Sequence, residues 1–151
     1  QQQLCRVDCL QICDALDPSA YGLLRNALPG VTLVQVVHVR DEASIDEAQR
    51  VAPHVDRLLL DSGNPGLAVK ELGGTGRLHD WDLSRRICRS VDLPVFLAGG
   101  LTPQNVAQAI ATVRPYGVDV CSGVRSEGRL DADKLHAFMQ AVASVAEVPA
   151  K

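Results

Sequence analysis

Short apolar runs alternate along this chain with segments in which an apolar residue recurs at every third or fourth position. The apolar runs predict buried parallel strands, and the recurring pattern predicts amphipathic helices. The predicted strands occupy residues 4–12, 32–39, 55–61, 94–98 and 117–121. A predicted helix follows each strand, at residues 18–28, 44–52, 81–91, 103–113 and 131–145. This repeated βα order predicts one α/β domain over residues 1–151, with a parallel sheet and right-handed crossovers.

Two architectures fit this order of elements. One is an open, doubly wound sheet, and the other is part of a (β/α)8 barrel, whose usual length is about 250 residues. The composition of the chain does not distinguish them. Both architectures place a ligand at the carboxyl ends of the strands, and several predicted strands end there in polar residues or glycines. These residues are Asp61, Gly99, Gly100, Ser122 and Gly123.

The segment 97–106 carries the clearest sign of a ligand site. A buried strand ends there in Gly99 and Gly100, and Thr102 and Pro103 follow as a candidate helix N-cap and first helical residue. Free N–H groups and the positive end of the helix dipole attract an anion, and glycine lets a phosphate approach the backbone closely. The segment therefore predicts a phosphate site, with an ordinary βα turn as the alternative.

Asp61 is the last residue of the predicted strand 55–61. A carboxyl at such a strand end faces the ligand crevice, where desolvation raises a carboxyl pKa toward the range of a general acid. A solvated carboxylate that caps the following turn is the alternative. The connection 62–80 is long and contains flexible backbone around Gly74, which could fold over a ligand. A disordered surface loop is the alternative for this connection.

Charge and composition exclude several classes of function. The formal net charge is -3 and aromatic residues make up 3% of the chain, so a nucleic-acid partner is not expected. The sequence contains no apolar run of membrane-spanning length. Five cysteines at irregular spacing favour reduced thiols in the cytoplasm over a disulfide framework. Cys5, Cys9 and Cys13 lie too far apart along a strand to share one metal ion, and we expect no metal and no cofactor.

The order and spacing of several short motifs, from about residue 34 to residue 138, resemble phosphoribosylanthranilate isomerase, an enzyme family of tryptophan biosynthesis. The motifs that carry the resemblance are Leu59-Leu60-Asp61-Ser62, Gly73-Gly74-Thr75-Gly76, Asp80-Trp81, Ala98-Gly99-Gly100-Leu101, Asn105-Val106 and Val118-Asp119-Val120-Cys121-Ser122-Gly123-Val124. Leu10-Gln11 resembles the remnant of a family strand with a glutamine that faces the barrel interior.

The resemblance implies a (β/α)8 barrel of which this chain holds the fourth to eighth βα units. It implies an Amadori rearrangement of N-(5-phosphoribosyl)anthranilate, a phosphorylated sugar, with Asp61 as the general acid. The phosphate would lie on the backbone of the two glycine turns, at Gly99, Gly100, Ser122 and Gly123. The residues expected to line the rest of the substrate are Gln11, His38, Gly74 and Asp119, although a hydrogen-bonded structural role is the alternative for His38.

The sequence also departs from the family pattern. The general-base cysteine and the arginine that pairs with the anthranilate carboxylate belong to the family's first two strands, which have no counterpart here. Ile12-Cys13 stands where the family usually has histidine after the glutamine, and Arg125 stands where it usually has glutamate. These departures leave open a non-catalytic, phosphosugar-binding homologue, and the turns alone would also suit an unrelated phosphate-binding barrel isomerase.

Five parallel strands do not close a barrel, and their open edges invite pairing with another chain. We expect an N-terminal part that precedes Gln1, because the only methionine is Met139. A separate chain that supplies the missing strands and a self-associating homo-oligomer are the alternatives.

Overall fold

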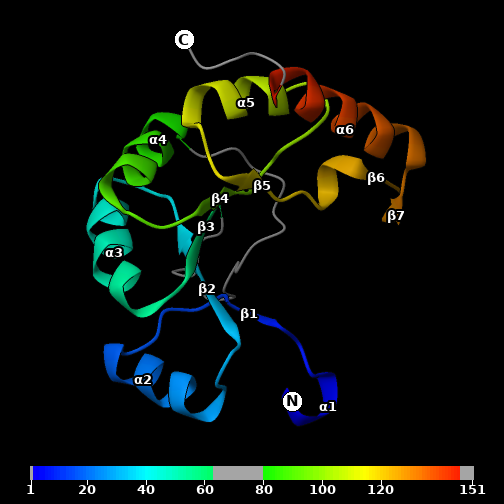
Figure 1. Cartoon of the computed structure of the whole chain (residues 1–151). Coiled ribbons are helices and arrows are strands. Elements are labelled where there is room, and N and C mark those ends of the chain that lie inside the picture. The colour runs from blue at the N-terminus through cyan, green and yellow to red at the C-terminus, as the bar shows by residue number, and fades with distance from the viewer. Residues whose placement is uncertain (1, 63–79, 147–151) are drawn as a thin grey trace.

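Five parallel strands form one sheet in the order β1-β2-β3-β4-β5 in the computed structural model, which describes residues 2–62 and 80–146 (Figure 1). The strands are β1 (Cys9–Ile12), β2 (Thr32–His38), β3 (Arg57–Asp61), β4 (Val95–Leu97) and β5 (Gly117–Val118). The helices are α1 (Gln2–Cys5), α2 (Pro18–Ala27), α3 (Ala43–Val51), α4 (Trp81–Ser90), α5 (Val106–Val113) and α6 (Ala132–Ala146). Short 3-10 turns, η1 (Ala52–His54) and η2 (Ser122–Val124), complete the α/β order that the sequence predicts.

The helices α2 to α6 follow one another in an arc along one side of the sheet (Figure 1). Strand alternation explains this arrangement, because Leu58, Leu60 and Leu97 point toward the helices and are fully buried against them. Val36 and Leu59 lie in a second apolar cluster, to which none of the described helices contributes. A doubly wound sheet requires helices on both faces, so the described elements do not follow that architecture.

Three predictions of local structure are wrong. Residues 4–12 do not form one strand: α1 ends at Cys5, and Arg6 has a φ of +49°, which breaks an extended path before β1 begins at Cys9. Helix α5 begins at Val106 and not at Pro103, and its N-cap is Asn105 and not Thr102. The described residues also include a hairpin that the pattern did not predict.

The hairpin consists of β6 (Arg125–Ser126) and β7 (Arg129–Leu130). Its turn is Glu127-Gly128, with φ values of +50° and +75°. The Arg125 guanidinium donates to the carbonyl oxygen of Gly128 at 2.9 Å. Each strand of the hairpin is too short to show the alternation on which strand prediction depends.

Asp56 ties β2 to the segment before β3 at the amino-terminal end of the sheet. Its Oδ2 accepts hydrogen bonds from the backbone N–H of Leu33 and from the Arg25 guanidinium, both at 2.7 Å. The Arg25 hydrogen bond is the main cause of the lowered pKa of the Asp56 carboxyl. This contact lies at the end of the sheet opposite to the predicted site, so it serves stability.

We expect Asp56→Ala to lower the free energy of unfolding by about 1–2 kcal/mol, chiefly because the fully buried Leu33 N–H loses its acceptor. The ion pair itself adds little, since both side chains are more than a third exposed. The contribution is present above the unfolded-state pKa of about 3.9 and is lost as the pH falls through the lowered folded-state pKa. Urea denaturation at neutral and acidic pH measures both effects. Asp8→Ala removes an exposed carboxylate that has no hydrogen bond or ion pair to any other described residue, and an equal loss in that control would contradict the prediction.

Candidate functional site at the carboxyl ends of the strands

Asp61 ends β3 in a position that is almost withdrawn from solvent. Only 6% of the residue is exposed, and its Oδ1 accepts a hydrogen bond from the backbone N–H of Ser62 at 2.7 Å. The sheet continues past the strand here, because the N–H of Val39 donates to the carbonyl oxygen of Asp61 at 2.9 Å. Both bonds fix the backbone, so the carboxylate is held at the strand end with little freedom.

The turn after β4 adopts a conformation that requires glycine. Gly99 and Gly100 have φ values of +83° and +65°, in the left-handed region. A Cβ on Gly99 would lie 2.9 Å from Oγ of Ser62, which joins this turn to the end of β3. The N–H groups of Gly99 and Gly100 donate to no other group in the part of the chain that the structure describes. They are available to an anion.

Asn105 holds the rest of this turn. Its Oδ1 accepts a hydrogen bond from the N–H of Thr102 at 2.8 Å, and its Nδ2 donates to the carbonyl oxygen of Gly100 at 3.0 Å. These two bonds close a turn over residues 102–105, which is why α5 begins only at Val106. Sequence reasoning gave the capping role to Thr102. Asn105 holds the N-cap position instead, but its side chain makes no capping hydrogen bond to the first turn of α5.

The chain after β5 packs directly against the turn after β4. A Cβ on Gly123 would lie only 1.8 Å from the backbone carbonyl oxygen of Leu101. Glycine at this position lets η2 approach the neighbouring turn, and the two glycine turns form one unit. The sequence predicts both turns but not their contact.

A cavity of about 40 Å³ lies where these segments meet. It is lined by five of the predicted site residues: Asp61, Gly99, Gly100, Asp119 and Ser122. Gly123 does not line the cavity, but it packs against the backbone of Leu101 in the turn that does. The carboxyl ends of β3, β4 and β5 are therefore brought together around one small polar space.

Asp119 faces Asp61 across this space. Burial is the main cause of a raised pKa of the Asp119 carboxyl, and the negative charge of Asp61 raises it further. Ala98, directly after β4, also lines the cavity, and its small side chain leaves room for both carboxyl groups. Asp119 therefore holds a proton to higher pH than an ordinary aspartate does.

The other predicted residues do not line this cavity. His38 is the register partner of Asp61 on the next strand, but its side chain lines a separate groove. Gln11 is exposed on β1, at the edge of the sheet, and its Nε2 lies 3.6 Å from Sγ of Cys13. Gly74 lies outside the described residues.

The described residues contain no group of three His, Cys, Asp or Glu side chains that could hold a metal ion. Within the same ranges, no helix combines the length and the apolar character needed to cross a bilayer.

The fold and the site define a parallel α/β protein that offers an acidic pair and glycine turns at the carboxyl ends of its strands. Comparison with known proteins identifies the group more closely. The sequence profile of N-(5′-phosphoribosyl)anthranilate isomerase matches residues 1–141. The chain therefore belongs to the N-(5′-phosphoribosyl)anthranilate isomerase family, as the motifs imply.

Individual relatives agree with this assignment. The chain is 43% identical over 124 residues to N-(5′-phosphoribosyl)anthranilate isomerase from Methanocella arvoryzae, covering 82% of this chain and 56% of the relative. It is 50% identical over 111 residues to the enzyme of the same name from Haloferax volcanii, covering 73% and 48%. The chain thus spans about half the length of the curated relatives that it matches.

Solved structures show the same fold. Phosphoribosyl anthranilate isomerase from Thermotoga maritima matches with a TM-score of 0.75 at 27% identity, covering 95% of this chain and 65% of that one. The corresponding protein from Thermococcus kodakaraensis matches with a TM-score of 0.71 at 33% identity, covering 93% and 66%.

Proposed function

We propose that the protein carrying this chain is an isomerase of tryptophan biosynthesis that acts on N-(5′-phosphoribosyl)anthranilate. The observation that carries the proposal is the cavity between Asp61, Asp119 and the two glycine turns, in a chain of this family. A phosphorylated sugar has an anionic end and a ring oxygen that must be protonated, and the cavity pairs an anion-binding backbone with a buried acid.

In the proposed Amadori rearrangement, Asp61 donates a proton to the ribose ring oxygen. The bond between C1′ and that oxygen breaks, and the electron pair of the aniline nitrogen forms a Schiff base. A general base then removes the C2′ proton, and the resulting enol becomes the ketone. Asp119, whose carboxyl stays protonated to higher pH, lines the reacting end of the sugar beside Asp61.

The phosphate is proposed to bind the backbone of Gly99, Gly100, Ser122 and Gly123. The N–H groups of Gly99 and Gly100 donate to no other group within residues 2–62 and 80–146, which supports this role at the first turn. The close contact of η2 with that turn supports the same role for the second turn. Gln11, His38 and Gly74 remain proposed substrate-lining residues, from the strand ends and from the connection after β3.

The five strands are proposed to be the fourth to eighth strands of an eight-stranded barrel. The one-sided helix cover supports this assignment, because barrel helices form a single outer ring. On this proposal residues 1–151 are part of one barrel domain, and the edges at β1 and β5 pair with strands from the preceding part of the protein, from another chain or from a second copy. The family's general base would come from those strands. We further propose that the protein is cytoplasmic and that it needs no cofactor.

Turnover of N-(5′-phosphoribosyl)anthranilate by the purified native protein tests this function. The anthranilate-type fluorescence of the substrate is lost as the product forms, so the reaction can be followed directly. We expect turnover without added metal or cofactor. Binding of the compound without turnover would overturn the proposal in favour of a non-catalytic phosphosugar-binding homologue.

A further inference from the structure

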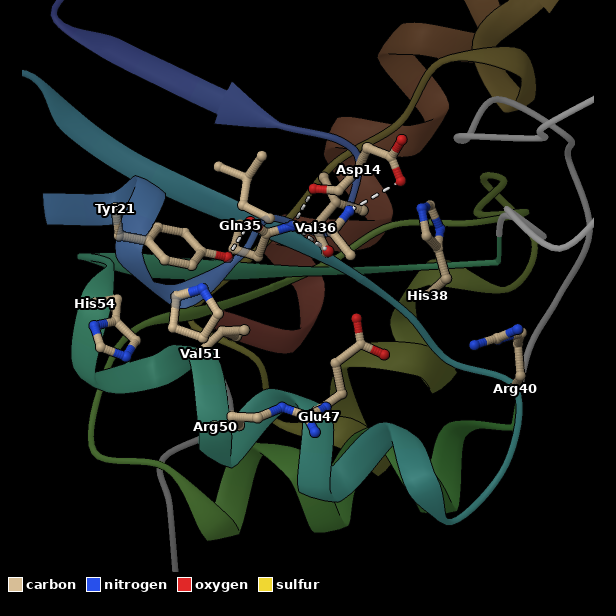
Figure 2. A pocket seen from close by; sticks show the side chains of 13 residues that line it. Asp14, Tyr21, Gln35, Val36, His38, Arg40, Glu47, Arg50, Val51 and His54 are labelled. Carbon is tan, nitrogen blue, oxygen red and sulfur yellow. Dashed lines mark hydrogen bonds between the residues drawn. The ribbon is translucent and has the colours of Figure 1, made fainter. Parts of the chain in front are cut away.

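A groove of about 440 Å³ runs along β2 between α2 and α3, and none of its lining residues lines the strand-end cavity (Figure 2). It opens because β1 ends at Ile12, opposite Gln35, while β2 continues to His38. The groove falls within the range of small-molecule sites, about 300–1,000 Å³. We call it the β2 groove; Gln35 and His38 on β2 and Glu47 and Arg50 on α3 line it.

Hydrogen bonds make the floor of the β2 groove rigid. The hydroxyl of Tyr21 donates to Oε1 of Gln35 at 2.7 Å, and both residues are 1% exposed. The Nε2 of Gln35 donates to the backbone carbonyl oxygens of Ile12 and Asp14, at 3.2 and 3.1 Å. Tyr21 also stacks on His54, with ring centroids 5.4 Å apart. A floor that is already ordered loses little entropy when a ligand binds.

His38 presents an unused acceptor at one end of the β2 groove. The residue is 5% exposed, and its Nε2 lies 3.1 Å from the carbonyl oxygen of Cys13. A carbonyl only accepts, so in the neutral ring Nε2 carries the hydrogen and Nδ1 is a bare acceptor. This buried Nδ1 has no hydrogen-bond partner among the residues that the structure describes. A ligand with an N–H donor would satisfy it.

Charged side chains of both signs line the same groove without pairing. Glu47 rises from α3 toward β2, and Arg50 lies one turn further along the same helix (Figure 2). Arg40 lines the groove from beyond the end of β2. None of these three side chains forms a hydrogen bond or an ion pair within residues 2–62 and 80–146. Burial is the main cause of the raised pKa of Tyr21, and the negative charge of Glu47 raises it further.

We propose that the β2 groove binds a small zwitterion with an apolar side chain, the chemistry of an apolar α-amino acid. The ammonium group would bind the Glu47 carboxylate and donate to Nδ1 of His38. The carboxylate would bind the Arg50 guanidinium, and the side chain would pack on Val51. A zwitterion can pair with Glu47 and with the exposed Arg50 at the same time, whereas a ligand with charge of only one sign pairs with one of them.

Calorimetric titration of the native protein with L-leucine and L-phenylalanine tests the proposal. N-acetyl-L-leucine lacks the ammonium group and L-leucinamide lacks the carboxylate. Each analogue loses charge-assisted hydrogen bonds, so we expect it to bind about tenfold or more weakly than L-leucine. The absence of binding by both amino acids, or binding of either analogue as tightly as L-leucine, would overturn the proposal.

Two variants with matched controls locate the binding site. Glu47→Gln and Arg50→Gln should each weaken L-leucine binding about tenfold. Asp46→Asn, on the same helix, and Arg89→Gln, on α4, change exposed residues that do not line the groove, and should leave binding within twofold. The ¹⁵N signal of His38 Nδ1 should move when L-leucine is added. A stationary signal, or equal losses in variants and controls, would contradict the assignment. None of these measurements depends on isomerase activity.

Discussion

Asp61→Asn is expected to abolish isomerisation, with a loss of turnover of about 10²–10⁴-fold, the usual contribution of a general acid. The amide has nearly the same shape as the carboxyl group and can still accept the hydrogen bond from the N–H of Ser62. It has no acidic proton to give to the ring oxygen. Substrate-analogue affinity should therefore stay within a few-fold while turnover is lost. Steady-state turnover and analogue binding, measured on the same preparation, separate the two effects.

Asp92→Asn is a suitable control, because Asp92 is exposed and lines no part of the strand-end cavity. Retained turnover in Asp61→Asn would remove this residue from the mechanism.

The same variant tests the pKa of the Asp119 carboxyl, since it removes the negative charge of Asp61. The pKa of the Asp119 carboxyl should fall but stay above its ordinary value, because burial is the larger cause of the shift. Carboxyl ¹³C signals followed through a pH titration would show this directly.

The strand ends could be predicted from the sequence because hydrophobic patterning has a direct physical cause. A strand that is buried on both faces is mostly apolar, as the centre of β3 is, and β2 departs from this only at Gln35 and at its two ends. Polar residues then appear where the strand leaves the sheet. Asp61 and Gly99 stand at such points, and parallel pairing brings successive strand ends to one edge. Topology thus brings together the five predicted residues that line the strand-end cavity.

Contacts between side chains far apart in the sequence could not be predicted in this way. The hydrogen bond from Tyr21 to Gln35 depends on where α2 lies against β2, and no periodic pattern encodes that position. The left-handed backbone at Arg6 is equally invisible in the sequence, because glycine is the residue that normally marks such a position. For this reason the segment 4–12 was predicted as one strand.

The pairing of β1 with β2 ends at Ile12, and Cys13, the next residue, is one at which the sequence departs from the family pattern. The sequence shows only that Cys13 replaces a usual residue. In the structure, the carbonyl oxygen of Cys13 accepts from Nε2 of His38, and the β2 groove opens beside it. Cys13, a departure from the isomerase family pattern in the sequence, therefore lies at the edge of the β2 groove, the second candidate site.

Gly123→Ala is expected to destabilise the strand-end site more than any exposed substitution in the chain. The added Cβ would lie 1.8 Å from the carbonyl oxygen of Leu101 and 3.1 Å from Cα of Thr102. Both are backbone atoms, so no side chain can rotate away and the two glycine turns must separate. We expect the free energy of unfolding to fall by about 2–3 kcal/mol, the cost typical of overpacking. Affinity for a phosphorylated substrate analogue should fall with it, because separated turns no longer present their N–H groups to one phosphate.

Gly22→Ala provides a control of opposite sign. Gly22 lies within α2, and a Cβ there would meet nothing within 4 Å. Alanine is favoured over glycine in a helix by about 0.8–1.0 kcal/mol, so this variant should be more stable than the native protein. Urea denaturation of both variants, together with calorimetric titration of the analogue, measures the contrast. If Gly123→Ala kept native stability and native affinity, the two turns could not form one rigid unit, and the phosphate would have to bind elsewhere.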